Sequence, residues 1–351
     1  MSRALVTGGA GFIGTNLADR LLGEGHRVRI VDNLARPGVE RNLAWLQHRH
    51  GDGLEVMVGD LCEMSVATGA IQEVDTVFHL AAQVAVTTSL EDPVLDFDVN
   101  LIGTVNLLEA ARVRARPPAF LFTSTNKVYG GLEDVELHDN DGRYEPVSHS
   151  VRRSGISEAR PLDFCTPYGC SKGAADQYVL DYAKSYGLRT VVFRMSCVYG
   201  PHQRGSEDQG WVAHFAIRAL EGESITLYGD GHQVRDVLYV DDLVEAFLVA
   251  RDGVDLLSGH AYNIGGGPAN AVSLLEVIER IGELAGEVPA IDYGPWRQGD
   301  QRYYVTDTRR FGEDTGWQPR VEAEEGIERL YEWLQAERRV ESRTRAEPSA
   351  V

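Results

Sequence analysis

The chain has 351 residues, a formal net charge of −19 and a hydrophobic fraction of 43%. This length allows one large α/β domain together with a smaller lobe. The acidic balance argues against nucleic acid and anionic membrane surfaces as partners, and the chain has no apolar run of about 18 residues that would predict a membrane span. The four cysteines form no C-x-x-C pair, so we expect reduced thiols, a cytoplasmic location and no metal site.

Short apolar runs alternate with helical patterns along the first half of the chain. Strands are predicted at 4–7, 28–32, 55–59, 76–80, 120–124 and 190–194. Helices are predicted at 11–23, 100–113 and 174–186. This alternation predicts right-handed βαβ units, and therefore an α/β fold with a doubly wound parallel sheet of Rossmann type.

The domain organisation follows from where this alternation stops. Residues 1–194 are expected to form the dinucleotide-binding domain, in which the polar stretch 130–163 predicts a lid or flap on the substrate side. Residues 195–337 are expected to form a smaller C-terminal α/β substrate lobe, with about 235–263 returning to the main sheet. Helices are predicted in that lobe at 212–220, 273–284 and 326–336. The charged stretch 338–351 predicts a flexible tail.

A glycine-rich turn, Gly8–Gly14, lies between the first predicted strand and the first predicted helix. Glycine permits the tight turn and lets the backbone approach a pyrophosphate, which then lies at the positive end of the helix. Asp32 ends the next predicted strand, where a carboxylate binds a ribose diol and repels a 2′-phosphate. This pattern favours NAD, although the nearby Arg36 leaves NADP open.

Tyr168 and Lys172 are four residues apart, so on a helix their side chains would share one face. A free phenol has a pKa of ~10 and is a poor base at neutral pH. A neighbouring ammonium and a positive nicotinamide ring are expected to lower that pKa, so that Tyr168 can act as general base for a sugar hydroxyl. Thr125 ends a predicted strand and can share the proton, while Lys172 can also bind the nicotinamide ribose.

With these motifs the chain resembles the extended short-chain dehydrogenase/reductase family from Ala4 to about Glu337. The resemblance implies Thr125, Tyr168 and Lys172 as catalytic residues. Pattern and resemblance together predict an NAD site made of Gly8, Gly11, Phe12, Ile13, Gly14, Asp32, Asn33, Asp60, Leu61, Leu80, Ala81, Ala82, Gln83, Asn100, Tyr168, Lys172, Arg194, Ser196 and Val198. They predict a substrate site made of Gln83, Thr87, Thr125, Asn126, Ser196, Gln209, Val212, Arg235 and Arg302. The resemblance also implies a homodimer that packs through 100–113 and 174–186.

The residues that follow Thr125 bear on the reaction. Sugar 4,6-dehydratases of the family have Asp-Glu there, and nucleotide-sugar decarboxylases have a Glu, whereas this chain has Asn126 and Lys127. Neither side chain can act as a carboxylic acid, so elimination of water is not expected. The remaining reaction is oxidation of a carbinol to a ketone, followed by re-reduction with the same NAD. The outcome of these two steps is epimerisation.

A narrower resemblance implies the substrate. The segments that are similar to CDP-paratose 2-epimerases (CDP-tyvelose epimerases) are 83–89, 124–130, 167–178, 208–212 and 233–237. They imply inversion at C2 of a CDP-linked deoxyhexose. Cys165 departs from the pattern, which predicts a histidine there, and this leaves the exact sugar open. The diphosphate requires local cations in an acidic chain, for which Arg235, Arg302 and Arg297 are candidates.

Three other functions stay open at the level of sequence. They are a UDP-sugar 4-epimerase, a net oxidoreductase that releases NADH, and a dinucleotide-binding regulatory protein without turnover. The intact set of Thr125, Tyr168 and Lys172 argues against the last.

Overall fold

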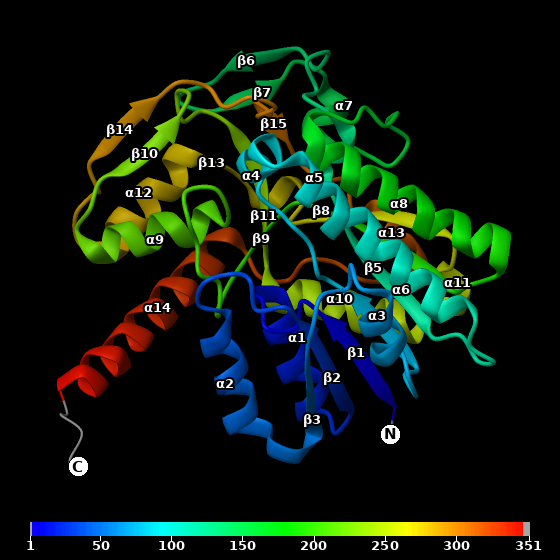
Figure 1. The fold of residues 1–351 in the computed structure, drawn as a ribbon. Helices are drawn as coiled ribbons and strands as arrows, with labels where there is room; N and C mark the ends of the chain where they lie inside the picture. The colour runs from blue at the N-terminus through cyan, green and yellow to red at the C-terminus, as the bar shows by residue number, and fades with distance from the viewer. Residues whose placement is uncertain (1, 347–351) are drawn as a thin grey trace.

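Seven parallel strands form the central sheet of the computed structural model, which describes residues 2–346 (Figure 1). Their spatial order is β12 (His260–Ile264), β8 (Thr190–Met195), β5 (Ala119–Thr125), β4 (Thr76–His79), β1 (Arg3–Thr7), β2 (Arg27–Asp32) and β3 (Leu54–Val58). Every residue of β5 is buried, as expected for a parallel strand that is covered on both faces. The predicted doubly wound Rossmann-type sheet is confirmed.

Helices cover both faces of this sheet, because each helix buries one apolar stripe against the strands. One face carries α1 (Phe12–Gly23), α2 (Val39–His50), α10 (Val240–Asp252), α11 (Val254–Leu257) and α13 (Arg309–Thr315). The other face carries α3 (Met64–Ala70), α6 (Gly103–Arg112) and α8 (Thr166–Tyr186). Leu17 and Phe247 are fully buried in the core of the first face, and Leu107 and Val179 in that of the second.

The strand order reverses between β1 and β4, which are neighbours in the sheet although β2 and β3 lie between them in the chain. Loops after two such strands leave in opposite directions, and the crevice between them is where open α/β sheets bind ligands. The two loops stay close here, because the Ala81 backbone N–H donates to the Thr7 hydroxyl at 3.1 Å. The glycine-rich turn that follows β1 therefore lies at the ligand-binding edge of the sheet.

A second lobe lies beyond the carboxyl ends of the main strands (Figure 1). Its sheets contain β9 (Cys197–Tyr199), β11 (Val234–Tyr239), β13 (Ala271–Ser273) and β15 (Tyr303–Tyr304), with β10 (Ile225–Tyr228) paired to β14 (Ile291–Gly294). Its helices are α9 (Trp211–Glu221), α12 (Leu274–Ala285) and α14 (Ala323–Ala346). Phe215, Ile278 and Leu330, one from each helix, are buried in a core that belongs to this lobe.

The segment 235–263 divides between the two lobes. β11 pairs with β9, β13 and β15 in the second lobe, so the strand itself does not join the main sheet. α10 covers the main sheet and β12 forms its edge beside β8. The return to the main sheet thus begins after β11, about five residues later than the sequence suggested.

The insertion 130–163 contains a hairpin of β6 (Leu137–Asp139) and β7 (Tyr144–Pro146), followed by α7 (His149–Ser154). Backbone hydrogen bonds tie it to the second lobe, from Tyr144 N to His232 O at 2.9 Å and from Ile156 N to Val305 O at 2.7 Å. Ile156 also packs beside Tyr304 in a small buried cluster. A role of this insertion as a lid stays a prediction.

Three helices differ from the sequence expectations. α8 begins at Thr166, eight residues earlier than expected, with Pro167 in its first turn, a position that suits proline because no N–H is needed there. The helix expected to start at Asn100 is preceded by α4 (Val86–Glu91), α5 (Pro93–Phe97) and a π-helical turn (Asp98–Ile102). The tail predicted from residue 338 is helical as far as Ala346, and residues 347–351 lie outside the described chain.

Short 3-10 turns complete the fold at Gly51–Gly53, Asn126–Tyr129 and Pro268–Asn270. Among residues 2–346, no helix has both the length and the apolar character that crossing a membrane requires.

Candidate active site

The glycine-rich turn packs so closely that side chains would not fit. Gly8 has φ of +65°, and a Cβ placed on it would lie 2.8 Å from the Ala81 backbone nitrogen. A Cβ on Gly14 would lie 2.3 Å from the Gly8 carbonyl oxygen. Gly11 is the N-cap of α1 and offers no side-chain cap, so the first N–H groups of that helix are available to an anion. This cradle fits the backbone approach that a dinucleotide pyrophosphate needs.

Acidic side chains at the ends of β2 and β3 organise the neighbouring loops. Asp32 accepts hydrogen bonds from the Ala10 backbone at 3.0 Å and from the Leu34 backbone at 2.9 Å. Asp60 accepts from the Asn33 side-chain amide at 3.1 Å and from a backbone N–H of the same loop. The predicted residues of the adenosine side therefore lie together, at the edge of the crevice that the glycine turn borders.

The turn after β4 contains the predicted residues Leu80 to Gln83. The Leu80 and Ala81 backbones donate to Thr7, and the Gln83 backbone donates to the Asn100 side chain at 3.0 Å. The Gln83 amide folds back and donates to the Ala85 carbonyl at 2.8 Å. Gln83 was predicted to contact both cofactor and substrate, but this hydrogen bond uses its side chain within its own turn.

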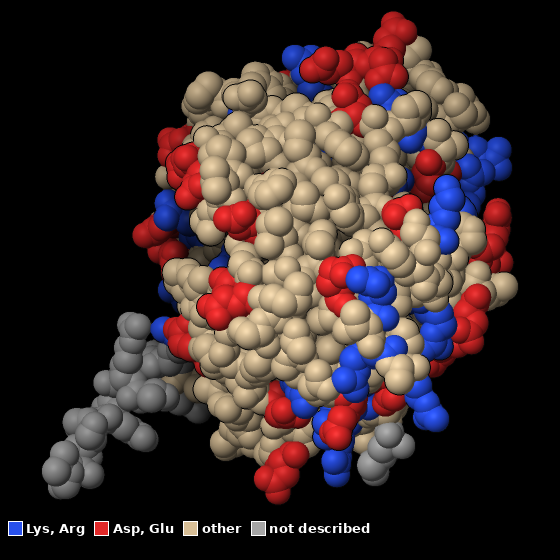
Figure 2. Space-filling model, turned by 45° about the vertical axis from the view of Figure 1, so that its right-hand side comes forward, with Lys and Arg blue, Asp and Glu red and all other residues tan. Residues whose placement is uncertain are grey.

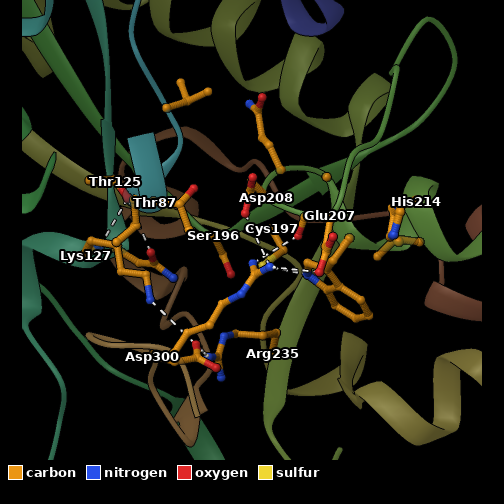
Figure 3. A pocket seen from close by; sticks show the side chains of 18 of the residues that line it. Thr87, Thr125, Lys127, Ser196, Cys197, Glu207, Asp208, His214, Arg235 and Asp300 are labelled. Carbon is orange, nitrogen blue, oxygen red and sulfur yellow. Dashed lines mark hydrogen bonds and ion pairs between the residues drawn. The ribbon is translucent and has the colours of Figure 1, made fainter. Parts of the chain in front are cut away.

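A cavity of about 490 Å³ opens between the two lobes. Its wall combines the end of β5, Tyr168 in the first turn of α8, the link from β8 to β9, and the segment 297–300 of the second lobe. Figure 3 labels Thr125, Ser196, Cys197 and Asp300 among these residues. Of the predicted site residues, those that line it are Phe12, Ile13, Thr87, Thr125, Asn126, Tyr168, Ser196, Val198, Gln209, Val212 and Arg235. The predicted catalytic hydroxyls thus face the same space as most of the predicted substrate residues.

Several polar atoms in the cavity wall have no hydrogen-bond partner within the described protein. These buried atoms are Thr87 Oγ1, Ser124 Oγ, Gln203 Oε1, Gln209 Oε1 and Gln233 Oε1. Buried polar groups are nearly always paired, so orphans that gather on one wall mark a site for a polar ligand. Because they are hydroxyls and amides, a ligand with many hydroxyl groups would pair with them well.

Tyr168 and Lys172 lie on the first turns of α8, with Tyr168 hydrogen-bonded to Thr125. Burial raises the pKa of Tyr168 to about 12, and the Thr125 hydrogen bond opposes that rise. Burial lowers the pKa of Lys172 to about 7, while Asp176 and Asp96 oppose that fall. The expected lowering of the Tyr168 pKa is therefore wrong for the protein by itself, because burial outweighs the contribution of any neighbour.

A buried carboxylate that the sequence did not point to supports this pair. Asp96, which is fully buried, accepts hydrogen bonds from the Ser171 hydroxyl and from the Asn100 amide, the latter at 3.1 Å. Asn100 also donates to Ser171 at 3.1 Å. Asp96 and Asn100 are four residues apart, and this helical spacing was the one available sign that both would face α8.

The backbone that presents Tyr168 is held in a rare conformation. Thr166 has φ of +65°, which is unusual for a β-branched residue. A Cβ on Gly299 would lie 2.8 Å from the Thr166 methyl group, so the segment 297–300 packs directly on the start of α8. The active-site helix and the second lobe therefore meet at this turn.

Two predicted arginines do not face the cavity. Arg194 makes a buried bidentate pair with Asp176, in which Nε and Nη2 each donate to one carboxylate oxygen at 2.9 Å. Its Nη1 donates to the Tyr129 hydroxyl at 3.1 Å. Its guanidinium therefore holds α8 to β8 and is not directed to the nicotinamide side. Arg302 stacks on Trp296 and Tyr144 and borders a neighbouring cavity, because these aromatic faces hold it away from the main one.

Most charged side chains in the cavity lie in segments or at positions that were named from the sequence, but their pairing depends on the fold. Arg235 donates to Asp300 at 2.7 Å, and Lys127 donates to the Gly299 carbonyl at 3.1 Å with Asp300 at 3.9 Å (Figure 3). Arg297 pairs with Glu207 and Asp208 on another part of the wall. Lys127 is 173 positions from Asp300 in the chain, so only the fold reveals that they are neighbours.

The sequence pattern of the NAD dependent epimerase/dehydratase family matches residues 4–265. Over 338 residues the chain is 41% identical to the CDP-paratose 2-epimerase of Salmonella typhi, covering 94% of this chain and 98% of that protein. It is 35% identical over 337 residues to the UDP-glucose 4-epimerase of Mycolicibacterium smegmatis, with 95% and 98% covered.

Solved structures agree with this assignment. The fold is similar to the UDP-glucose 4-epimerase of Thermus thermophilus in complex with NAD, with a TM-score of 0.79, 35% identity, and coverage of 95% of this chain and 99% of that one. It is also similar to the UDP-glucuronic acid 4-epimerase of Bacillus cereus in complex with UDP-glucuronic acid and NAD, with a TM-score of 0.82, 26% identity and the same coverage. Sequence, fold and the arrangement of the glycine turn with Tyr168 and Lys172 all lead to one assignment: the chain belongs to the NAD-dependent epimerase/dehydratase family.

Proposed function

We propose that this protein is a nucleotide-sugar epimerase that inverts C2 of a CDP-linked deoxyhexose with bound NAD. The observation that carries the proposal is the 41% identity with a CDP-paratose 2-epimerase over 94% of the chain. The cavity supports it, because Thr125 and Tyr168 face a space walled by orphaned hydroxyls and amides. Such a wall suits a sugar.

The NAD site in this proposal follows the crevice between β1 and β4. The turn from Gly8 to Gly14 binds the pyrophosphate at the start of α1, and Asp32 binds the adenosine ribose. Lys172 binds the nicotinamide ribose, and Phe12, Ile13 and the loops after β3, β4 and β8 supply the remaining contacts. When bound, NAD supplies the oxidant that removes hydrogen from a sugar carbon and later returns it.

Tyr168 is the acid–base residue in the proposed reaction. It accepts the proton of the sugar hydroxyl as the carbonyl forms, and it returns the proton when the carbonyl is reduced from the opposite face. Thr125 holds the same hydroxyl and shares the proton, because its side chain is hydrogen-bonded to Tyr168. Lys172 contributes positive charge close to the phenol, which favours phenolate once the sugar is in place.

Epimerisation suits the cavity better than dehydration. Asn126 and Lys127 occupy the turn after Thr125, and neither can supply the carboxylic acid and carboxylate that elimination of water requires. The carboxylates that do line the cavity, among them Glu207 and Asp300, are paired with arginines. A ketone formed next to Thr125 would therefore be reduced again without loss of water.

The test is product analysis with purified protein. Incubation with CDP-paratose and CDP-tyvelose, followed by NMR of the sugar protons, should show interconversion at C2 without net change in nicotinamide absorbance. No inversion of CDP-sugars together with inversion of UDP-glucose at C4 would replace the proposal by the second candidate. That candidate, a UDP-sugar 4-epimerase, has the support of 35% identity with the Mycolicibacterium smegmatis enzyme.

Two further outcomes would point to other classes of protein. Stoichiometric growth of the nicotinamide absorbance with substrate would indicate a net oxidoreductase. Full biological function of a Tyr168→Phe variant would indicate a dinucleotide-binding regulator without turnover.

We also propose a homodimer. The face shown in Figure 2 carries few charged side chains over a broad area. Helices on that side of the molecule expose large apolar residues: Leu90, Val94, Leu95, Phe97 and Tyr178. Exposed apolar areas of this kind mark protein interfaces, and a second copy of the chain offers the same surface. Light scattering should give twice the monomer mass, and a Phe97→Asp variant should give the monomer.

A further inference from the structure

Lysine is rare in this chain, which contains only Lys127, Lys172 and Lys184 among 34 basic Lys and Arg residues. Lys184 is exposed on α8. The other two lie beside the predicted catalytic hydroxyls, Lys172 one turn after Tyr168 and Lys127 two residues after Thr125. Lys172 has a place in the proposed reaction, whereas Lys127 has none so far.

Lys127 extends from the turn that holds Thr125 into the cavity (Figure 3). Its backbone N–H donates to the Thr125 hydroxyl at 3.2 Å, which fixes the start of the side chain next to the reacting group. At the other end, its ammonium donates to the Gly299 carbonyl at 3.1 Å and lies 3.9 Å from Asp300. Asp300 in turn accepts from Arg235 at 2.7 Å. Lys127 and Arg235 therefore lie on either side of Asp300, and the Lys127 side chain begins next to Thr125.

The charges on this path do not balance. One carboxylate, Asp300, lies between the Lys127 ammonium and the Arg235 guanidinium. Burial lowers the pKa of Lys127. The Asp300 carboxylate opposes that effect, and the Arg235 guanidinium adds to it. An anion that contacts both cations would supply the missing charge and favour the protonated amine.

The chemistry of a sugar nucleotide relates the position of such an anion to the carbon that reacts. C2 is bonded to C1, and C1 bears the oxygen of the first phosphate. A sugar that presents its C2 hydroxyl to Thr125 and Tyr168 must therefore place that phosphate within a few bonds of them. A sugar that presents C4 places the phosphate on the far side of the ring. Because the Lys127 side chain begins next to the catalytic threonine, its ammonium suits the first geometry better than the second.

We propose that Lys127 binds the sugar-linked phosphate and thereby directs C2 to the catalytic residues. This proposal rests on the proposed function. The diphosphate spans Lys127 and Arg235, with its sugar-linked phosphate on Lys127. Lys127 is a specificity-determining residue in this arrangement, because it fixes the distance from phosphate to the catalytic hydroxyls.

The test compares nucleotides that differ by one phosphate. Calorimetric titration of the NAD-loaded protein with CMP and CDP measures the contribution of the second phosphate, the one that would carry the sugar. Lys127→Met should weaken the binding of CDP about 10- to 100-fold, as expected for a lost charge-assisted hydrogen bond. It should leave the affinity for CMP within about twofold of the original value. Lys184→Met is the matched control and should change neither value. Equal weakening of CMP and CDP, or unchanged CDP binding, would overturn the proposal.

Further readouts separate this proposal from the proposed function. Lys127→Arg should recover most of the CDP affinity, because it restores the positive charge, and Lys127→Gln should behave as Lys127→Met. Unchanged CMP binding by the variants also shows that they are folded. The CMP and CDP titrations need no turnover, so they decide the role of Lys127 even if no C2 epimerase activity is found. If C2 activity is found, a Lys127→Met variant with unchanged KM would count against the phosphate contact.

Discussion

The Asp96 carboxylate accepts a hydrogen bond from the hydroxyl of Ser171, the residue that immediately precedes Lys172. Both side chains are buried, and Asp96 raises the pKa of both Lys172 and Tyr168. One carboxylate outside the cavity wall thus acts electrostatically on the two groups that are expected to move and stabilise the proton. Asp96 is therefore a positioning residue whose charge can be tested apart from its shape.

Replacing Asp96 by Asn should shift both limbs of the pH profile of kcat to lower pH. Loss of the negative charge favours phenolate, so the pKa of Tyr168 falls from its present value of about 12 and the limb at high pH moves down. The same loss disfavours the ammonium, so the pKa of Lys172 falls below its present value of about 7 and the limb at low pH also moves down. Rates measured from pH 5 to 12 check this. Glu91→Gln, on the exposed end of α4, is the control and should leave the profile unchanged. An Asp96→Asn profile whose two limbs moved in opposite directions would contradict this explanation.

Replacing Tyr168 by Phe should lower kcat by about 10²- to 10⁴-fold, which is the usual contribution of a positioned acid–base group. The phenyl ring keeps the packing of α8, so the amount of NAD that co-purifies should not change. Tyr178→Phe, on the exposed side of the same helix, is the control and should retain full activity. A Tyr168→Phe enzyme with more than half of the normal kcat would assign the proton transfer to another group.

Replacing Gly14 by Ala should reduce NAD content and cost about 1–3 kcal/mol of unfolding free energy, because overpacking forces backbone shifts. The new Cβ would lie 2.3 Å from the Gly8 carbonyl oxygen, so the glycine turn must move. Gly23→Ala in the same helix meets nothing within 4 Å and should be neutral or slightly stabilising. Urea unfolding and the absorbance of released NAD measure both effects. Equal behaviour of the two variants would show that the close packing of the turn is unimportant.

Replacing Asp176 by Asn should destabilise the fold by about 3–5 kcal/mol, because it leaves the buried Arg194 guanidinium without its counter-charge. The two side chains are 0% and 6% exposed and 2.9 Å apart. The exposed pair of Arg189 and Asp255 provides the contrast, since Asp255→Asn should cost no more than about 1 kcal/mol. Urea unfolding curves compare them, and similar costs at the two sites would refute the buried-charge argument.

Local motifs carried much of what the sequence could predict. The glycine turn, Asp32, and the pair of Tyr168 and Lys172 act within short stretches, where spacing along one strand or helix determines which side chains meet. Arg297 and Arg302 show where this fails. They are five residues apart, and only the aromatic faces of Trp296 and Tyr144 decide that Arg302 turns to the neighbouring cavity.

Contacts between distant segments were beyond sequence reasoning for a related reason. The approach of Lys127 to Asp300 depends on how the second lobe is placed on the main sheet. Arg194 matched a family position, yet its bidentate contact with Asp176 gives it a structural role. The end of α14 was also missed, because charged residues after 338 lack apolar spacing although a helix that has already formed extends at little cost.

Thr166 has a left-handed backbone conformation two residues before Tyr168, the proposed acid–base residue. Such a conformation costs of order 1–3 kcal/mol and persists only where the surroundings enforce it. Gly299 packs against the Thr166 methyl group, and its carbonyl accepts a hydrogen bond from the Lys127 ammonium. Thermal stability and the proposed orientation of Tyr168 therefore place opposite demands on this turn. A substitution that relaxed the backbone at Thr166 would raise the melting temperature and would let the Tyr168 side chain reorient.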